Sequence, residues 1–168
     1  MHSPITIRLA TIADAPAVLR CLHTAFAPYR DQYSSAAFAD TVLDPETLRL
    51  RMEVMSILVA LAKSGEIVGT VAYQALDTGT SEKKDGHMRG MAVLPNQQGQ
   101  GVAGLLLRAA ESELRVLGCS RITLDTTAPL HRAIRFYENN GFVQSGVVAD
   151  FFGMPLYEYT KELSDGST

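Results

Sequence analysis

The sequence has only two cysteines among its 168 residues, and this scarcity argues against a small protein held together by disulfides or by a structural metal. Cys21 and Cys119 lie far apart, each among apolar residues, so we expect buried, reduced thiols rather than a disulfide framework. Cys21 and His23 are close in sequence, but no further cluster of cysteine or histidine completes a ligand set, and no metal site is expected. The fold must therefore be held by an ordinary apolar core.

Basic charge and long apolar runs are also missing. The formal net charge is −3, which gives no basic footprint for nucleic acid. This charge is compatible with a cationic acceptor, and it is equally the default of a cytoplasmic protein, which is the localisation we expect. The longest apolar run, 55–62, is short and is interrupted by Ser56, so neither a signal peptide nor a membrane span is predicted.

What the chain does contain is enough apolar material for one core. Hydrophobic residues make up 46% of the sequence, which at this length is typical of one globular domain. There is no internal repeat and no linker. We predict a single domain over residues 1–163, followed by a frayed C-terminal tail at 164–168.

The most informative stretch runs from His87 to Leu117. It is predicted to begin as a strand, because apolar residues precede Pro95, which cannot continue a β-ladder. It is predicted to end as a helix, 101–117, which Gly118 terminates. The apolar face of that helix consists of Val102, Leu105, Leu106, Ala109, Ala110, Leu114 and Leu117.

Between this strand and helix lies a glycine-rich turn with Gly99, Gly101 and Gly104. Glycine lets backbone amides converge on a ligand, and a helix N-terminus adds unpaired N–H groups, so the turn predicts a phosphate or pyrophosphate site. The same glycines fit a dinucleotide (NAD) fingerprint, with Asp125 about 20 residues further on. That alternative is weaker, because residues 94–98 separate the strand from the first glycine and too little sequence follows for the remaining βαβ units.

The other segments give the element order β-α-α-β-β-β-α-β-α-β-β. Strands are expected at 5–9, 57–62, 67–73, 121–126, 146–152 and 154–162, besides the one that begins at His87. Helices are expected from Thr11 or Asp14 to just before Pro28, after Pro45, over 101–117, and from Pro129 to Asn140. The fold class is α/β: a mixed, mostly antiparallel sheet with one parallel crossover, flanked by helices.

Two motifs carry a resemblance to a known family. Gln98-x-x-Gly101-x-Ala103, preceded by Met91-Ala92-Val93-x-Pro95, resembles the acyl-CoA signature of the GNAT superfamily of N-acetyltransferases. The segment 132–142, which reads Arg-Ala-Ile-Arg-Phe-Tyr-Glu-Asn-Asn-Gly-Phe, resembles the second signature of that superfamily. The resemblance implies the GNAT fold, which has the element order given above, and acetyl-CoA as the cofactor.

The resemblance also implies a cofactor site. The pantetheine arm would pair with the main chain of Met91, Ala92 and Val93. The pyrophosphate would be held by the amides of Gln98, Gly99, Gln100, Gly101, Val102, Ala103 and Gly104. Arg132 and Arg135 could meet the phosphates, or could belong to a solvated helix face. Many family members carry Asn where this chain has Leu130, and Thr126 or Thr127 could supply the missing polar contact.

Tyr137 is the expected catalytic residue, because the matching tyrosine of the family faces the cofactor sulfur. A phenol with a pKa of about 10 can protonate a leaving thiolate of similar basicity; the alternative is a tyrosine packed in the core. The general base is open, and ordered water could supply it. His87 titrates in the useful range, but the sequence favours a solvated histidine at a strand end over that role. Asp85, Asp150 and Glu138 are lesser candidates.

For the acceptor, the resemblance indicates the connection between the first two helices and the last hairpin. The residues there are Tyr29, Arg30, Tyr33, Asp150 and Phe152. Aromatic rings with a carboxylate could enclose a primary amine; they could equally form a homodimer surface or a minor core.

The function predicted from the sequence is acetyl-CoA-dependent N-acetylation by direct transfer to the primary amine of a small molecule, an amino acid or a protein. No motif around either cysteine suggests an acyl-enzyme. The alternatives are a non-catalytic acyl-CoA-binding regulatory domain on the same fold and, further off, an NAD-dependent enzyme. The acceptor cannot be read from the sequence, and neither nucleic acid nor a membrane is an expected partner.

Overall fold

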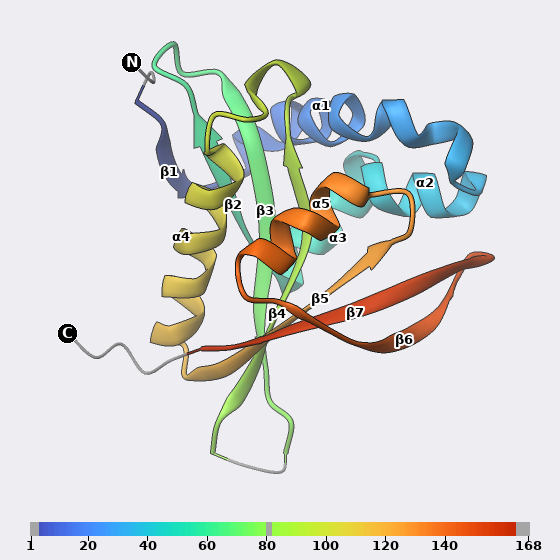
Figure 1. Cartoon of the computed structure of the whole chain (residues 1–168). Helices are drawn as coiled ribbons and strands as arrows, with labels where there is room; N and C mark the ends of the chain where they lie inside the picture. Colours follow the sequence, from blue (N-terminus) through green and yellow to red (C-terminus); the bar gives the residue numbers. More distant parts are fainter. Residues whose placement is uncertain (1–3, 80–81, 164–168) are drawn as a thin grey trace.

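The computed structural model describes residues 4–79 and 82–163, which form a seven-stranded sheet (Figure 1). The strands lie in the order β1-β2-β3-β4-β5-β7-β6, and β4 and β5 are the parallel pair in an otherwise antiparallel sheet. The predicted mixed, mostly antiparallel sheet with one parallel crossover is therefore confirmed. The strands are β1 Thr6–Leu9, β2 Ser56–Leu61, β3 Ile67–Leu76, β4 Lys84–Val93, β5 Cys119–Thr127, β6 Val143–Phe151 and β7 Met154–Glu162.

The helices differ from the prediction at one place. Between β1 and β2 the structure has three α-helices, where the sequence predicted two: α2 (Ser35–Val42) is additional. It is a short helix that begins at the N-cap Ser34, whose hydroxyl accepts a hydrogen bond from the Ala37 amide, and it has too few turns to show a clear period. The other α-helices are α1 Ala15–Phe26, α3 Pro45–Val54, α4 Val102–Val116 and α5 His131–Asn139, with 3-10 turns η1 Ile12–Asp14, η2 Ala27–Gln32 and η3 Pro95–Gln97.

Helices cover both faces of the sheet, and each layer has its own core. On one face α4 and α5 pack through Leu106, Leu114 and Tyr137 against sheet residues such as Met88 and Leu124. The other face carries a second apolar cluster, made by α1 and α3 with β2, β3 and β4; its buried residues include Val18, Cys21, Leu22, Leu48, Ile57, Val59 and Ala92. The site described below lies between these two layers, where the sheet itself opens.

The sheet opens between β4 and β5. The two strands pair only from Lys84 to Met88, and β4 has no β5 partner after that residue (Figure 1). The β3–β4 register shifts where Gly90 adopts a left-handed φ of 65°, so β4 carries a bulge just past the last paired residue. A bulge bends its strand and increases the local twist. The bulge therefore accounts for the divergence of β4 from β5, which leaves the second half of β4 as a strand edge inside the molecule.

The two cysteines are free and buried, as the sequence predicted. Among the described residues, none of the helices is both long and apolar enough to cross a membrane. In the same part of the chain no group of three or more histidine, cysteine or acidic side chains is arranged to hold a metal ion.

Candidate active site

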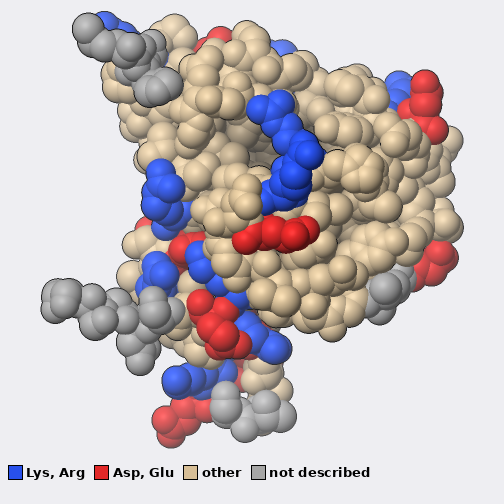
Figure 2. Space-filling view, viewed as in Figure 1, with Lys and Arg blue, Asp and Glu red and all other residues tan. Residues whose placement is uncertain are grey.

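A cavity of about 600 Å³ occupies the opening between β4 and β5. Figure 2 shows a hollow near the middle of the face viewed in Figure 1, with a row of basic side chains along its border. The cavity joins two regions that we name by their composition. The loop end comprises Met91–Val93 of β4, Gln98, Gly99 and residues 101–104. The charged end comprises Tyr29, Tyr33, Asp40, Arg51, His87, Arg89 and Asp125.

The loop end is made of unpaired main-chain donors. Gly99 and Gly101 both have left-handed φ values, 80° and 83°, and Gly101 is the N-cap of α4. Among the described residues, no main-chain acceptor pairs with the amides of 99–104, and the first helical bond is donated by Leu105 to the Gly101 carbonyl at 3.1 Å. Free N–H groups at a helix N-terminus favour an anion. The loop end can therefore bind phosphate groups through its backbone.

Gln98 ties this loop to two other elements. Its Nε2 donates to the Val93 carbonyl at 3.1 Å, and its Oε1 accepts from Arg132 Nη1 at 2.9 Å. Arg132 at the start of α5 therefore stands beside the loop and lines the cavity. Arg135, which the sequence analysis named with Arg132 as a possible phosphate contact, is exposed on α5 and is not part of the cavity lining. Gln100 is also outside the lining, with its side chain 3.5 Å from the Asn96 carbonyl.

Tyr137 lies on α5 in the wall of the same cavity. Its ring is buried between Phe136 and Phe142 in edge-on contacts, with centroid distances of 5.5 Å and 5.7 Å. Burial raises the pKa of the phenol well above its usual value, so the hydroxyl holds its proton throughout the neutral range. The ring therefore belongs to the core and also lines the cavity, and the role of Tyr137 as an acid stays a prediction.

Two threonines at the end of β5 have different partners. The hydroxyl of Thr127 is 2.6 Å from the Tyr33 hydroxyl. The hydroxyl of Thr126 is buried and has no hydrogen-bond partner among the described residues, although Thr126 lines the cavity beside Leu130. A buried hydroxyl without a partner costs free energy, and a ligand can remove that cost. Of the two threonines suggested as replacements for the family's Asn, Thr126 is the one whose hydroxyl is available.

At the charged end, the charges of His87 and Asp125 each influence the pKa of the other. His87 Nδ1 is 2.8 Å from the Thr123 hydroxyl, which leaves Nε2 without a partner among the described residues. Burial lowers the pKa of His87, while the nearby Asp125 carboxylate opposes that shift. Burial raises the pKa of Asp125 in turn, and His87 opposes it. An imidazole that is neutral at pH 7 beside a carboxylate can accept a proton from an amine.

The charged end also receives groups from α2 and α3. Arg89 of β4 forms an ion pair with Asp40 of α2 at 3.2 Å. Arg51 of α3 lines the cavity beside them. The sequence analysis did not propose Asp40 or Arg51, because they lie far from β4 in the chain and carry no motif.

Of the five acceptor residues predicted from the sequence, two line the cavity and three do not. Tyr29 and Tyr33 line the cavity. Arg30 does not; its guanidinium lies over the Phe38 ring, 5.2 Å from the centroid. Asp150 is exposed outside the lining, and Phe152 is 54% exposed at the hairpin tip, where its carbonyl accepts a hydrogen bond from Ser34. The neighbouring Phe151, and not Phe152, reaches the cavity.

The family model and the related proteins that this chain matches are all described as acetyltransferases. Residues 19–142 match the family described as the acetyltransferase (GNAT) family. The uncharacterized N-acetyltransferase YjgM of Escherichia coli (strain K12) is 34% identical over 144 residues, which cover 84% of this chain and 83% of that protein. The aminoglycoside N(6')-acetyltransferase type 1 of Stenotrophomonas maltophilia is 30% identical over 154 residues, 90% of this chain and 94% of that protein.

Solved structures share the fold at low sequence identity. The PaiA N-acetyltransferase of Thermoplasma acidophilum, solved in complex with coenzyme A, superposes with a TM-score of 0.78 over 95% of this chain and 99% of that chain, at 16% identity. The ribosomal-protein-S18-alanine N-acetyltransferase of Escherichia coli gives a TM-score of 0.75 over 98% of this chain and 97% of that chain, at 19% identity.

Proposed function

This chain belongs to the acetyltransferase (GNAT) family and is an N-acetyltransferase that uses acetyl-CoA, and from that premise we propose direct acetyl transfer to a primary amine, with Tyr137 as the general acid. The observation that carries the proposal is the single cavity that joins the free amides of the loop end to Tyr137. It connects a site for phosphate groups with a proton donor.

The residues of the loop end fit the cosubstrate. Amides from Gly99 to Gly104 and the guanidinium of Arg132 would hold the diphosphate, since both offer N–H donors to phosphate oxygens. The edge of β4 at Met91–Val93, which has no β5 partner, would pair with amides of the pantetheine arm, as strand edges do with any amide-bearing chain. Acetyl-CoA supplies the thioester whose cleavage releases a thiolate.

Tyr137 would deliver a proton from its hydroxyl to that thiolate. Burial raises the pKa of the phenol, so the proton is present over the working pH range. His87 would take a proton from the acceptor ammonium at Nε2, because burial keeps the imidazole neutral at pH 7 while Thr123 occupies Nδ1. Tyr137 and His87 both line this cavity, as the two roles require.

A covalent acyl-enzyme on cysteine has no support. Burial raises the pKa of Cys21 to about 12, and its Sγ lies 3.9 Å from the Ala92 carbonyl. Burial also raises the pKa of Cys119. Neither cysteine lines the cavity. Since the thiolate is the nucleophilic form, neither side chain is suited to attack a thioester, and attack by the amine itself is the simpler route.

The test combines ligand binding with turnover. Thermal unfolding in the presence of CoA, acetyl-CoA or NAD should show stabilisation by the first two alone, about 2.7 kcal/mol at 100 times Kd. Release of free thiol from acetyl-CoA should then depend on an added amine, and mass spectrometry should find the acetyl group on the amine and none on the protein. Stabilisation by CoA with no thiol release on any amine would indicate the regulatory alternative, and stabilisation by NAD would favour the dinucleotide alternative.

A further inference from the structure

Arg51 is a cation in the wall of the cavity, and no carboxylate of the described residues forms an ion pair with it. Its side chain crosses from α3 toward β4, where Nη1 lies 3.2 Å from the position that a Cβ on Gly90 would take. It forms no ion pair or hydrogen bond with any described residue, and it is partly buried. Burial and the charge of Arg89 lower the pKa of Arg51 to about 10, and the Asp40 carboxylate opposes this shift only in part, so Arg51 stays protonated at neutral pH but is poorly solvated. A charge in this state is unfavourable unless a ligand pairs with it.

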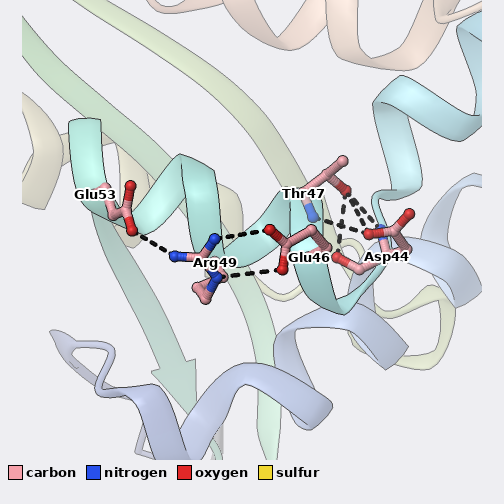
Figure 3. A network of polar contacts seen from close by, with 5 residues as sticks. All are labelled: Asp44, Glu46, Thr47, Arg49 and Glu53. Atoms are coloured by element: carbon pink, nitrogen blue, oxygen red, sulfur yellow. Dashed lines mark hydrogen bonds and ion pairs between the residues drawn. The ribbon is translucent and has the colours of Figure 1, made fainter.

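Arg49, two residues earlier on the same helix, is by contrast an arginine whose charge is paired with carboxylates. Figure 3 shows its guanidinium between Glu46 and Glu53 on the outer face of α3. Its Nη2 is 2.7 Å from a Glu46 carboxylate oxygen, and all three side chains are well exposed. Helix α3 therefore pairs its outward arginine with carboxylates and leaves its inward arginine unpaired.

The charges around Arg51 do not neutralise it. The neighbouring carboxylate on α2, Asp40, forms its ion pair with Arg89, at 3.2 Å. The remaining carboxylate in the lining is Asp125, which interacts with His87 and has no hydrogen bond or ion pair among the described residues. The charged end thus offers one free guanidinium and, at His87 and Asp125, a place for an amine.

We propose that the acceptor carries a carboxylate as well as its primary amine, as a free amino acid does, and that Arg51 binds this carboxylate while the amine lies toward His87 and Asp125. The inference rests on the proposed function and specifies its substrate class. A guanidinium presents paired N–H donors that match the planar geometry of a carboxylate. One free guanidinium supplies one charge, which suits a monoanion. A polycationic acceptor, such as the substrate implied by the name of the aminoglycoside enzyme, would instead bring ammonium groups against an uncompensated cation.

The experiment compares matched acceptors. Free amino acids are tested beside their carboxamides, their decarboxylated amines and an aminoglycoside, with thiol release from acetyl-CoA as the readout. Three variants are compared with the wild type: Arg51→Met, which keeps the length and removes the charge; Arg51→Lys, which keeps the charge and loses the planar fork; and Arg49→Met, the control on the outer face of α3. CoA binding is measured for each by thermal shift.

The wild type is expected to prefer an amino acid over its carboxamide by at least about tenfold in kcat/KM, because a charge-assisted pair is lost with the carboxylate. Arg51→Met should raise KM for the amino acid by about tenfold to a hundredfold, with kcat, the carboxamide reaction and CoA binding changed little. Arg51→Lys should recover part of the preference, and Arg49→Met should match the wild type.

Activity that is equal or higher on carboxamides, simple amines or the aminoglycoside would overturn the inference and leave the proposed function intact. So would an unchanged preference in Arg51→Met. A wild type that binds CoA but acetylates no amine would contradict the proposed function itself, which is a different outcome. A loss of activity in Arg51→Met on all acceptors together with lost CoA binding would show that Arg51 is structural, and would also overturn the inference.

Discussion

The loop end of the cavity is made of backbone amides from one continuous stretch, whereas the charged end is made of side chains from η2, α2, α3, β4 and β5. Backbone donors present the same groups whatever the side chains are, so long as the turn keeps its shape. Side chains gathered from distant elements can change one at a time. We therefore propose that the loop end holds the cosubstrate and that the charged end selects the acceptor.

The largest expected effect comes from Tyr137, which lines the cavity on α5. Tyr137→Phe removes the hydroxyl and keeps the ring contacts with Phe136 and Phe142. Loss of general acid catalysis should lower kcat by about 10²-fold to 10⁴-fold. Binding of CoA, followed by thermal shift, should be retained. A variant that keeps the wild-type rate across pH would remove the acid role from Tyr137.

Next in size is a change to the shape of the turn. Gly101→Ala puts a Cβ on a residue with φ of 83°, a conformation that costs an L-residue about 1–2 kcal/mol. If the turn relaxes to avoid this strain, the amides of the loop end lose their alignment, and KM for acetyl-CoA should rise by about tenfold. The matched control is Gly118→Ala, since Gly118 has φ of 89° at the other end of α4 and equal open space for a Cβ. Both variants should lose similar stability in urea. Equal KM values for the two would contradict a cosubstrate role for this turn.

A smaller effect is expected at the charged end when its pH dependence is measured. The Asp125 carboxylate raises the pKa of His87 against the dominant lowering by burial. Asp125→Asn should therefore lower the pKa of His87 further, and the acid limb of the kcat/KM profile should move to lower pH, because the base is active when deprotonated. An NMR titration of the imidazole should shift in the same direction. Asp85→Asn is the control, since Asp85 pairs with Arg121. An acid limb that moves to higher pH would argue against His87 as the base.

The smallest expected effect concerns Tyr33, which attaches η2 to the end of β5. Tyr33→Phe breaks the 2.6 Å hydrogen bond to Thr127 and should cost about 0.5–1.5 kcal/mol of stability. The acceptor wall would be less firmly held, so kcat/KM for the acceptor should fall a few-fold while KM for acetyl-CoA stays unchanged. A rise in KM for acetyl-CoA instead would show that the two ends are not separable in the way described.

The same contrast explains what could be predicted from the sequence. The strand, the glycine turn and α4 follow one another in the chain, so periodicity and Pro95 defined them and the loop end could be predicted. Arg51 and Asp40 come together with Arg89 only through packing of α2 and α3 against β4, and no spacing in the sequence relates them.

Two misplacements have local causes. A short helical segment allowed either Arg132 or Arg135 to face the phosphates, and the hydrogen bond from Arg132 to Gln98 shows which one lies beside the loop. At the last hairpin, Phe152 takes a left-handed φ of 50° at the turn, so its side chain leaves the alternation of the strand. Phe151, still within β6, is the residue that lines the cavity. Neither the turn conformation nor the choice between arginines could be read from residue types.

The short ladder between β4 and β5 has a mechanical consequence. It divides the sheet into two leaves, β1–β4 and β5–β7–β6, which share backbone bonds only along Lys84–Met88. A ligand whose amides pair with the free part of β4 would act as an added strand. Its binding would make both leaves more rigid on either side of the Lys84–Met88 ladder, which is the seam between them. Slower amide hydrogen exchange on each side of the seam, far from any direct contact, would then report occupancy, and the seam itself would exchange slowly in either state.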